Sequence, residues 1–488
     1  MAENTQIKLK TAPFPRGLFT FFFVNAAFMS GLIMINALLV LYLTRGIRMD
    51  VKHAYNVYAA FGALFYSSAL LGGFLGGRYD HKTAVIFGGL LAGCGSFLIT
   101  IPNIEMIFLG LSCFIVGSGL MIPNINCLTG KLFAKDDPLR DGGFTVAYIG
   151  TNVGSFVTAF ASGFIARYFS YETAYFFSSS MVLVSVVLFV IGYKRFNFHS
   201  SDQVIPYKSD VSMRNLLPMI VAAIITVPAI AILLSHAEVS NVLLIIGGIL
   251  MTGVVLSIAR KQKDKKARKK LYAFLIFTLF GLAFWALYML APSALTIFVQ
   301  NNVNRHIGTF IIPTSSVYSL NPFFIITVGA LTTLYFFRKS LKGERLPLRN
   351  KFAIGIISMG AGYITLVLAI SFAGKSGYIA FYWIVISYFL QTLGELFIGP
   401  IGFAMAGALA PAHLEGMMMG FFQLSTGVAG AISGFLASAT ATAPQHIADP
   451  HITNPTFAHF FALYGSITVA IGILIVSLTP QFKKLWSD

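Results

Sequence analysis

Long apolar segments alternate with short polar ones along the whole chain. Each apolar segment is close to the roughly 20 residues that a helix needs to cross the hydrocarbon core of a bilayer. The pattern therefore predicts membrane-spanning helices separated by loops. We place fourteen of them at residues 17–44, 53–77, 82–100, 104–132, 141–168, 173–194, 214–235, 239–259, 271–299, 317–338, 350–373, 378–408, 412–438 and 456–479.

The two halves of the chain match each other at a constant shift of 277 residues, with no gap across two consecutive predicted spans. The matching pairs are Gly117 with Gly394, Pro123 with Pro400, Gly130 with Gly407, Gly143 with Gly420, Phe144 with Phe421 and Gly150 with Gly427. The spans near 214–259 interrupt the correspondence. Parallel six-helix halves with substrate bound between them are the plan of the major facilitator fold.

We therefore expect an all-α polytopic membrane protein of that fold, with two extra helices between its bundles. Residues 1–195 form the predicted N-terminal six-helix bundle, and residues 271–488 form the C-terminal one. Residues 196–270 are predicted to hold a linker, the two additional helices and a basic cytoplasmic loop.

Composition and charge agree with this class. Of the 488 residues, 57% are hydrophobic and 10% are charged, whereas soluble proteins carry about 25% charged residues. The net charge of +17 follows the loops: 28 of the 34 Lys and Arg fall on the side of the termini and six on the other. Positive loops face the cytoplasm, so we expect both termini there, in a bacterial inner membrane. The charge indicates topology, not nucleic-acid binding.

One carboxylate stands inside an apolar span. Glu395 lies among glycines in the segment Tyr388–Ala410, and no other acidic residue of the 17 lies within a clearly hydrophobic span. A charge within the bilayer is costly and usually marks a functional site. The alternative is a protonated, hydrogen-bonded Glu395 that joins two helices. Under the 277-residue shift its counterpart is Ser118, so we expect the cavity to carry its charge on the second half only.

Two long segments resemble the signatures of the proton-dependent oligopeptide transporter family. They are GSGLMIPNINCLTGKLFAKDDPLRDGGFTVAYIGTNVG at Gly117–Gly154 and LQTLGELFIGPIGFAMAGALAP at Leu390–Pro411. Shorter echoes are ALLVLYL at Ala37–Leu43, FWALY at Phe284–Tyr288 and SLNPFFII at Ser319–Ile326. The resemblance covers nearly the whole chain, including the extra helix pair of bacterial members.

The resemblance implies where a ligand would bind. Glu395 matches the residue that meets the peptide amino terminus in the family, and we expect it to couple protons as well. Other positions implied or considered for substrate binding are Asn152, Asn321, Trp285, Tyr288, Tyr66, Asn36 and Asn25. Each asparagine could instead join helix to helix, which is worth about 0.6 kcal/mol on average, and each aromatic ring could simply pack.

The chain departs from the family at its charged positions. The first-span ExxER motif falls on Asn25, Phe28 and Met29, a substrate-binding arginine on Asn36, a fourth-span lysine on Ile122 and a seventh-span acid on Met289. The amine-binding end of the site therefore looks intact, while the carboxylate-binding end has lost its cations. Arg305, just beyond the span at 271–299, is another cation that could meet a ligand.

Other classes of protein lack support in the sequence. There is no catalytic constellation, no Walker A loop and no metal-ligand spacing, and Cys94, Cys113 and Cys127 read as buried hydrophobes. We expect no enzyme, no cofactor and no metal. We predict a monomeric, proton-coupled transporter of di- or tripeptides or amine-bearing solutes. A uniporter or exporter of another metabolite, or a non-transporting receptor of the same fold, stays open.

Overall fold

The computed structural model describes residues 15, 17–133, 139–193, 197–200, 203–206, 212–341, 347–409, 414–441 and 449–477. Within these ranges, fourteen helical segments are long and apolar enough to cross a membrane, as predicted. The helices are α1 (Leu18–Leu41), α2 (Val51–Arg78), α3 (His81–Leu98), α4 (Ile104–Lys131), α5 (Arg140–Tyr168), α6 (Tyr171–Tyr193), α7 (Met213–Ser235), α8 (Ala237–Lys261), α9 (Lys265–Tyr288), α10 (Thr296–Asn302), α11 (Leu320–Leu341), α12 (Leu348–Ser371), α13 (Phe381–Leu409), α14 (Glu415–Thr440) and α15 (Pro450–Ser477).

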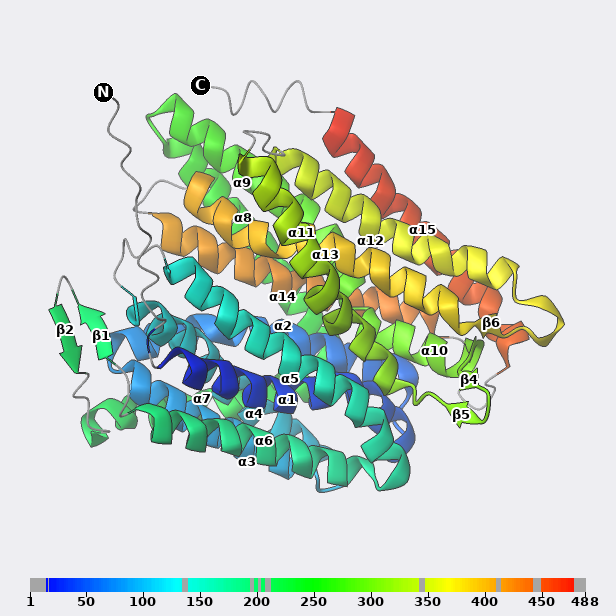
Figure 1. The fold of residues 1–488 in the computed structure, drawn as a ribbon, viewed down its shortest axis with the longest axis horizontal. Helices are drawn as coiled ribbons and strands as arrows, with labels where there is room; N and C mark the ends of the chain where they lie inside the picture. The colour runs from blue at the N-terminus through cyan, green and yellow to red at the C-terminus, as the bar shows by residue number, and fades with distance from the viewer. Residues whose placement is uncertain are drawn as a thin grey trace, which may run out of the picture.

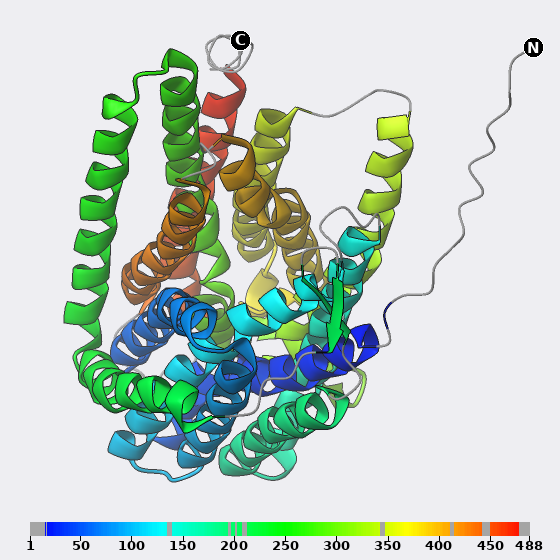
Figure 2. The ribbon, with the colours of Figure 1, turned by 90° about the vertical axis from the view of Figure 1, so that its left-hand side faces the viewer.

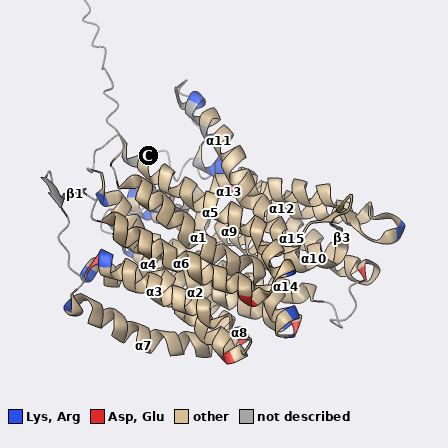
Figure 3. Ribbon diagram, turned by 60° about the horizontal axis from the view of Figure 1, so that its bottom comes forward, with Lys and Arg blue, Asp and Glu red and all other residues tan. Residues whose placement is uncertain are grey.

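The helices form two bundles that lie side by side (Figure 1). Helices α1–α6 pack against one another in the first bundle, drawn in blue to teal, and α9–α15 form the second. The Lys, Arg, Asp and Glu positions coloured on the ribbon in Figure 3 lie mostly at the two ends of the helices, and the band between the ends is almost free of them. This distribution fits a protein whose helices cross an apolar layer.

The matched glycines have the same packing role in both bundles. A Cβ at Gly117 of α4 would lie 2.4 Å from the Gly88 oxygen of α3, and a Cβ at Gly394 of α13 would lie 2.6 Å from the Gly355 oxygen of α12. Small residues let membrane helices approach this closely. The repeat seen along the sequence therefore corresponds to two helix pairs packed in the same way.

One predicted boundary is wrong. We expected the basic run Arg260–Lys270 to be a loop, but α8 continues to Lys261 and α9 already begins at Lys265. The side chain of Asp264 accepts hydrogen bonds from the backbone nitrogens of Lys266 and Ala267 and thereby caps α9. Lys and Arg are good helix formers, so charge alone does not end a helix here.

The predicted span 271–299 is one crossing but not one regular helix. After α9 ends at Tyr288, a wide turn, η2 (Ala291–Leu295), leads into α10. Pro292 sits at the start of this turn, and proline cannot donate the backbone hydrogen bond that a regular helix needs. The break falls beside the central cavity described below.

Helices α7 and α8 lie on the outside of the bundles (Figure 2, green). α7 packs on α4, α2 and α3, whereas α8 packs on α2, α14 and α9. Polar contacts anchor α8, because Asn56 of α2 donates to the Glu238 carboxylate at 3.2 Å and Asn241 donates to the Asn56 backbone oxygen at 3.2 Å. This pair therefore borders both bundles without entering the space between them.

The two bundles contact each other along α2 with α14 and along α5 with α11. They also meet at the end opposite the starts of α1 and α9, where η3 (Ser315–Ser319) packs on α5. Ser316 Oγ donates to the Phe160 backbone oxygen at 2.6 Å, and Ser162 Oγ donates to Ser315 Oγ at 3.2 Å. Short strands β1 (Asn197–Ser200) with β2 (Gln203–Pro206), β3 (Val303–Asn304) with β6 (Ile379–Ala380), and β4 (His306–Ile307) with β5 (Phe310–Ile311) pair in the connecting segments.

Candidate functional site

A cavity of about 290 Å³ lies between the two bundles. Helices α1, α2 and α5 supply one wall, and α9, η2, η3, α11 and α13 supply the other. The lining residues are Met29, Leu32, Ile33, Asn36, Tyr58, Phe61, Gly62, Phe65, Tyr66, Tyr148, Thr151, Asn152, Ser155, Tyr288, Met289, Pro292, Tyr318, Asn321, Pro322, Ile325 and Glu395.

Glu395 is the charged group of this cavity. Its Oε2 accepts a hydrogen bond of 2.6 Å from Asn321 Nδ2, and its Oε1 accepts one of 3.3 Å from Tyr288 Oη. Asn321 comes from α11 and Tyr288 from the end of α9, so three helices of the second bundle hold the carboxylate. The Asn321 amide also lies 3.3 Å from Thr392 Oγ1, one turn before Glu395.

The cavity contains no positive charge among the described residues that line it. Within the same parts of the chain, no Lys, Arg or His forms an ion pair with Glu395. A carboxylate in a low-dielectric site without a counter-charge is costly to keep ionised. It is suited either to hold a proton or to bind a cationic ligand group such as an ammonium.

The first bundle offers hydrogen-bonding groups across from Glu395. Tyr58 Oη donates to Asn36 Oδ1 at 3.1 Å, and Asn152 Nδ2 donates to the Tyr148 backbone oxygen at 3.0 Å. Asn36 and Asn152 are uncharged, so this wall can meet a polar ligand but cannot neutralise a carboxylate.

The structure brings together six of the eight residues that the sequence pointed to. Glu395, Asn152, Asn321, Tyr288, Tyr66 and Asn36 all line the cavity, whereas Asn25 and Trp285 do not. The Trp285 ring packs edge-on against Tyr288, with ring centroids 5.4 Å apart, and its Nε1 is buried without a partner among the described residues. Trp285 thus supports a cavity residue from behind.

The residues that stand where the resemblance implies charged family positions lie in different places. Met29, Asn36 and Met289 line the cavity, so three family charges are replaced at its wall. Phe28 is instead buried and stacks on Phe114, with ring centroids 6.2 Å apart. Ile122 is only partly buried and packs against the hydrophobic core.

Several other acidic and polar residues at or near the spans do not line the cavity. Ser118, the counterpart of Glu395, is fully buried and does not line the cavity. Asp50 precedes α2 and accepts from the His53 backbone nitrogen at 3.1 Å, and the side chain of Asp141 is outside the described residues. Asn124 is used for packing, since it contacts His81 and donates to the Gly72 oxygen.

Sequence reasoning missed three tyrosines of the cavity: Tyr58, Tyr148 and Tyr318. For Tyr148 a signal existed, because it stands four residues before Asn152 and so shares its helix face. A similar signal existed for Tyr318, which stands three residues before Asn321. For Tyr58 we find none, since aromatic residues make up 14% of the chain. No group of three or more His, Cys, Asp or Glu suited to a metal occurs in the described part of the chain.

Comparisons with known proteins agree with this geometry. The model of the POT family matches residues 82–453. The chain is 28% identical to dipeptide and tripeptide permease B of Salmonella typhimurium over 477 residues, which covers 96% of each protein. It is 27% identical to dipeptide and tripeptide permease A of Edwardsiella piscicida, which covers 99% of each.

Solved structures share the fold. A chain from a study of substrate recognition in proton dependent oligopeptide transporters superposes with a TM-score of 0.83 at 24% identity, covering 96% of this chain and 99% of that one. A tetrameric PepTSo2 crystal structure superposes with a TM-score of 0.84 at 23% identity, covering 96% and 99%. The fold class and the resemblance carried by Gly117–Gly154 and Leu390–Pro411 are confirmed. The chain is a multi-pass membrane protein and belongs to the POT family of transporters.

Proposed function

We propose that this chain is a secondary active transporter that moves small peptides or related amine-bearing solutes across the membrane by alternating access, coupled to protons. The observation that carries the proposal is Glu395, the one charged side chain among the described residues that line a cavity between the two bundles. The printed names of the relatives, dipeptide and tripeptide permeases, support the substrate class.

Glu395 binds the amino end of the substrate in this proposal. Asn321 and Tyr288 donate to its two oxygens and fix the carboxylate at the cavity wall. A peptide ammonium then supplies the counter-charge that the protein does not. Asn36, Asn152 and Tyr66 meet the rest of the ligand by hydrogen bonds and packing.

The same carboxylate takes part in proton coupling. Burial disfavours the ionised form of Glu395, whereas a bound ammonium favours it. Proton and ammonium therefore compete, and each weakens the binding of the other by the same factor. Lower pH should accordingly weaken the binding of an amine. Competition at one group alone gives exchange, so accumulation requires a second group that carries a proton. No other carboxyl group or histidine is among the described residues that line the cavity, so we expect that group elsewhere in the chain.

We infer the membrane and orientation from the loops. The excess of Lys and Arg on the side of the termini supports cytoplasmic termini, and the bacterial permease relatives support an inner-membrane location.

We propose the same division of the chain as the sequence predicts, into residues 1–195, 196–270 and 271–488, although α9 begins before residue 271. One relative crystallised as a tetramer; we propose that the monomer is the transport unit, because the cavity is built within one chain.

The experiment uses protein reconstituted into liposomes. With labelled dialanine and an acidic exterior, wild type should accumulate the peptide, and it should also show counterflow without a gradient. Glu395→Gln should lose the pH dependence but keep counterflow of an uncharged peptide blocked at both ends. Glu105→Gln, which removes an exposed carboxylate in the first turn of α4, is the matched control and should behave as wild type.

The outcomes separate the alternatives. A Glu395→Gln variant that still concentrates dialanine on an imposed proton gradient would refute the role in coupling. Wild-type counterflow of dialanine without pH-driven accumulation would indicate a uniporter or an exporter that accepts the peptide. If wild type shows neither, the protein is not a carrier of peptides.

A further inference from the structure

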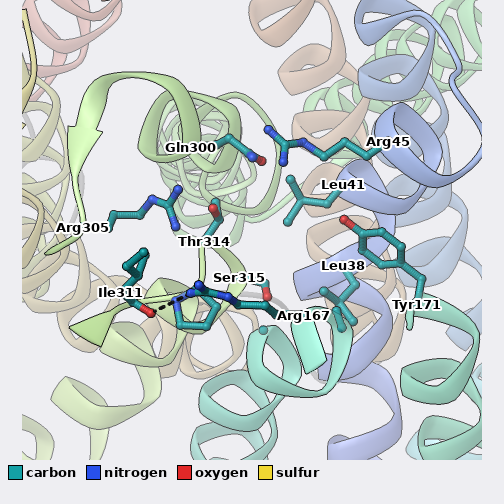
Figure 4. A pocket seen from close by; sticks show the side chains of 13 residues that line it. Leu38, Leu41, Arg45, Arg167, Tyr171, Gln300, Arg305, Ile311, Thr314 and Ser315 are labelled. Atoms are coloured by element: carbon teal, nitrogen blue, oxygen red, sulfur yellow. Dashed lines mark hydrogen bonds between the residues drawn. The ribbon is translucent and has the colours of Figure 1, made fainter. Parts of the chain in front are cut away.

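A second cavity, of about 380 Å³, lies where the two bundles meet at the end opposite the starts of α1 and α9. Three arginines from three separate elements line it. Arg45 belongs to η1 (Tyr42–Gly46) after α1, Arg167 to the last turn of α5, and Arg305 to the segment between β3 and β4. Figure 4 shows the three guanidinium groups arranged around Thr314 and Ser315.

The cavity spans the junction between the bundles. Arg45 and Arg167 come from the first bundle, and Arg305 comes from the second. At its wall, Gly163 of α5 approaches the segment before η3 so closely that a Cβ would lie 2.4 Å from Pro313 Cβ. Any ligand that contacts all three arginines therefore bridges two bodies that must separate if this end opens.

No acidic residue is among the described residues that line this cavity. The loops at this end of the bundles carry five acidic residues. Each stands at the start of a helix: Asp50 before α2, Glu105 in α4, Glu172 in α6, Glu238 in α8 and Asp449 before α15. None of them lines the cavity. The one ion pair among the described residues is between Lys52 and Glu238. By contrast, three of the six Lys and Arg at this end meet in one place.

The guanidinium groups of Arg305 and Arg167 have more N–H donors than their hydrogen bonds to backbone oxygens use. Arg305 Nη1 donates to the Ile312 oxygen at 2.7 Å and Arg167 Nη1 to the Ile311 oxygen at 3.2 Å. A guanidinium has five N–H donors, and the Arg305 Nε is buried without a partner in the described chain. The Arg45 guanidinium faces the Gln300 amide and donates to its oxygen in the amide orientation that satisfies both side chains.

The local electrostatics point the same way. Burial lowers the pKa of the Arg305 guanidinium below its ordinary value, and the positive charges of Arg45 and Arg167 lower it further. Arginine stays charged in proteins all the same, so the three groups repel one another, and an anion between them would offset that repulsion.

We propose that this cavity binds one small anion, a carboxylate or an inorganic oxyanion, which holds the two bundles together at this end. Guanidinium groups match the planar, bidentate geometry of carboxylates and phosphates. The volume accommodates such an anion together with ordered water. Separation of the bundles would carry Arg305 away from Arg45 and Arg167, so opening and anion release are linked.

Binding is tested on purified protein by its unfolding midpoint, with sodium phosphate or sodium acetate added at fixed ionic strength. At about ten times the dissociation constant, the anion should raise the Tm of wild type by on the order of 2 °C. The rise should saturate. It should be lost in Arg305→Gln and in the triple variant Arg45→Gln, Arg167→Gln, Arg305→Gln.

The control is the double variant Arg48→Gln, Lys375→Gln. It removes two exposed positive charges at the same end, outside the cavity, and should keep the wild-type response. An equal response in the triple variant, or no saturable response in wild type at millimolar anion, would overturn the proposal. Because this readout needs no transport, it stands or falls separately from the peptide-transport proposal.

A second measurement tests the bridging. Spin labels are placed at Tyr168 on α5 and Ser376 on η4 (Gly374–Ser376), both exposed and on different bundles, in a background with Cys94, Cys113 and Cys127 replaced by Ala. Phosphate should shift the distance distribution toward its shorter component in the wild-type background but not in the triple variant. A response to dialanine and not to its amide would assign the anion to the substrate carboxylate, and a response to phosphate alone would assign it to an inorganic ion. An unchanged distribution with every anion would refute bridging.

Discussion

The two cavities between the bundles have opposite electrostatic character. The central one has a single carboxylate, Glu395, and no cation among its described lining residues, whereas the outer one has three arginines and no acid. In each, the protein leaves a charge without a protein counter-charge at the junction of two bodies. Unpaired charge is most costly where it is dehydrated, which applies to the partly buried Glu395 and Arg305, whereas Arg45 and Arg167 are exposed. Each cavity is therefore suited to a ligand of the opposite charge.

The comparison also distinguishes how the charges are held. Three helices of one bundle hold Glu395 through side-chain hydrogen bonds of 2.6 and 3.3 Å, so the central charge stays with one bundle. The arginines divide between the two bundles. We therefore expect the central site to retain a ligand through a conformational change and the outer site to lose one.

The largest effect should come from giving the central cavity the cation that it lacks. In Met289→Lys, the new ammonium beside Tyr288 would pair with Glu395 and exclude the substrate amine. The affinity for dialanine should fall on the order of 100-fold. Isothermal titration with purified protein measures this. Met289→Leu, which conserves size and adds no charge, should bind within about two-fold of wild type.

The opposite result would contradict the role given to Glu395 in the central cavity. A Met289→Lys protein that binds dialanine as tightly as wild type would mean that Glu395 does not contact the ligand amine.

The next effect concerns the two ends of the ligand. Because the central cavity has an acid and no described cation, blocking the amino terminus of dialanine by acetylation should weaken binding by about ten-fold or more. Amidating its carboxylate should change binding by less than about three-fold. Competition against labelled dialanine gives both values. If dialanine bound much more tightly than its amide, a cation would have to contact the ligand carboxylate. The central cavity would then no longer differ from the outer one in lacking a cation.

A smaller effect on binding is expected from removing the peripheral helices. Neither α7 nor α8 lines either of these cavities. Replacing residues 194–263 by a flexible linker that leaves Asp264 to cap α9 should lower the Tm, because α8 contacts α2, α14 and α9. Binding of dialanine should stay within about two-fold of wild type. A folded deletion that lost binding would make the pair part of the site.

The smallest effect should come from Tyr288→Phe. This change removes one 3.3 Å hydrogen bond to Glu395 and leaves the ring in place. One hydrogen bond is worth about 1 kcal/mol, so dialanine affinity should change by roughly five-fold. Tyr382→Phe, on the exposed surface of α13, is the control and should not change it. An effect as large as that of Met289→Lys would mean that Tyr288 contacts the ligand itself.

Much of the fold could be predicted because it is encoded locally. Apolar length fixes which segments span, and the 277-residue shift identified the two helix pairs that Gly117 and Gly394 join in the same way. Glu395 stood out because a lone carboxylate in an apolar span is rare. The predicted start of α9 lies too late in the chain. The charge of the lysines and arginines before Leu271 predicts a loop, but these residues also favour helix formation.

The site was only partly predictable, because residues on one face of a helix lie at different depths and meet different neighbours, which sequence does not state. Asn25 and Asn36 lie on the same helix, yet only Asn36 reaches the central cavity. Trp285 and Tyr288 are one turn apart, and only Tyr288 lines the cavity and bonds to Glu395.

Composition and local pattern were enough to establish the class of the protein, the number of its spans, its family and its one intramembrane acid. Only the tertiary structure decided which partners hold Glu395 and that Arg45, Arg167 and Arg305 share one cavity. In the sequence these arginines are three isolated loop charges of the kind that set topology. They become one site because α5, η1 and the segment after β3 converge, and such convergence depends on packing between distant segments.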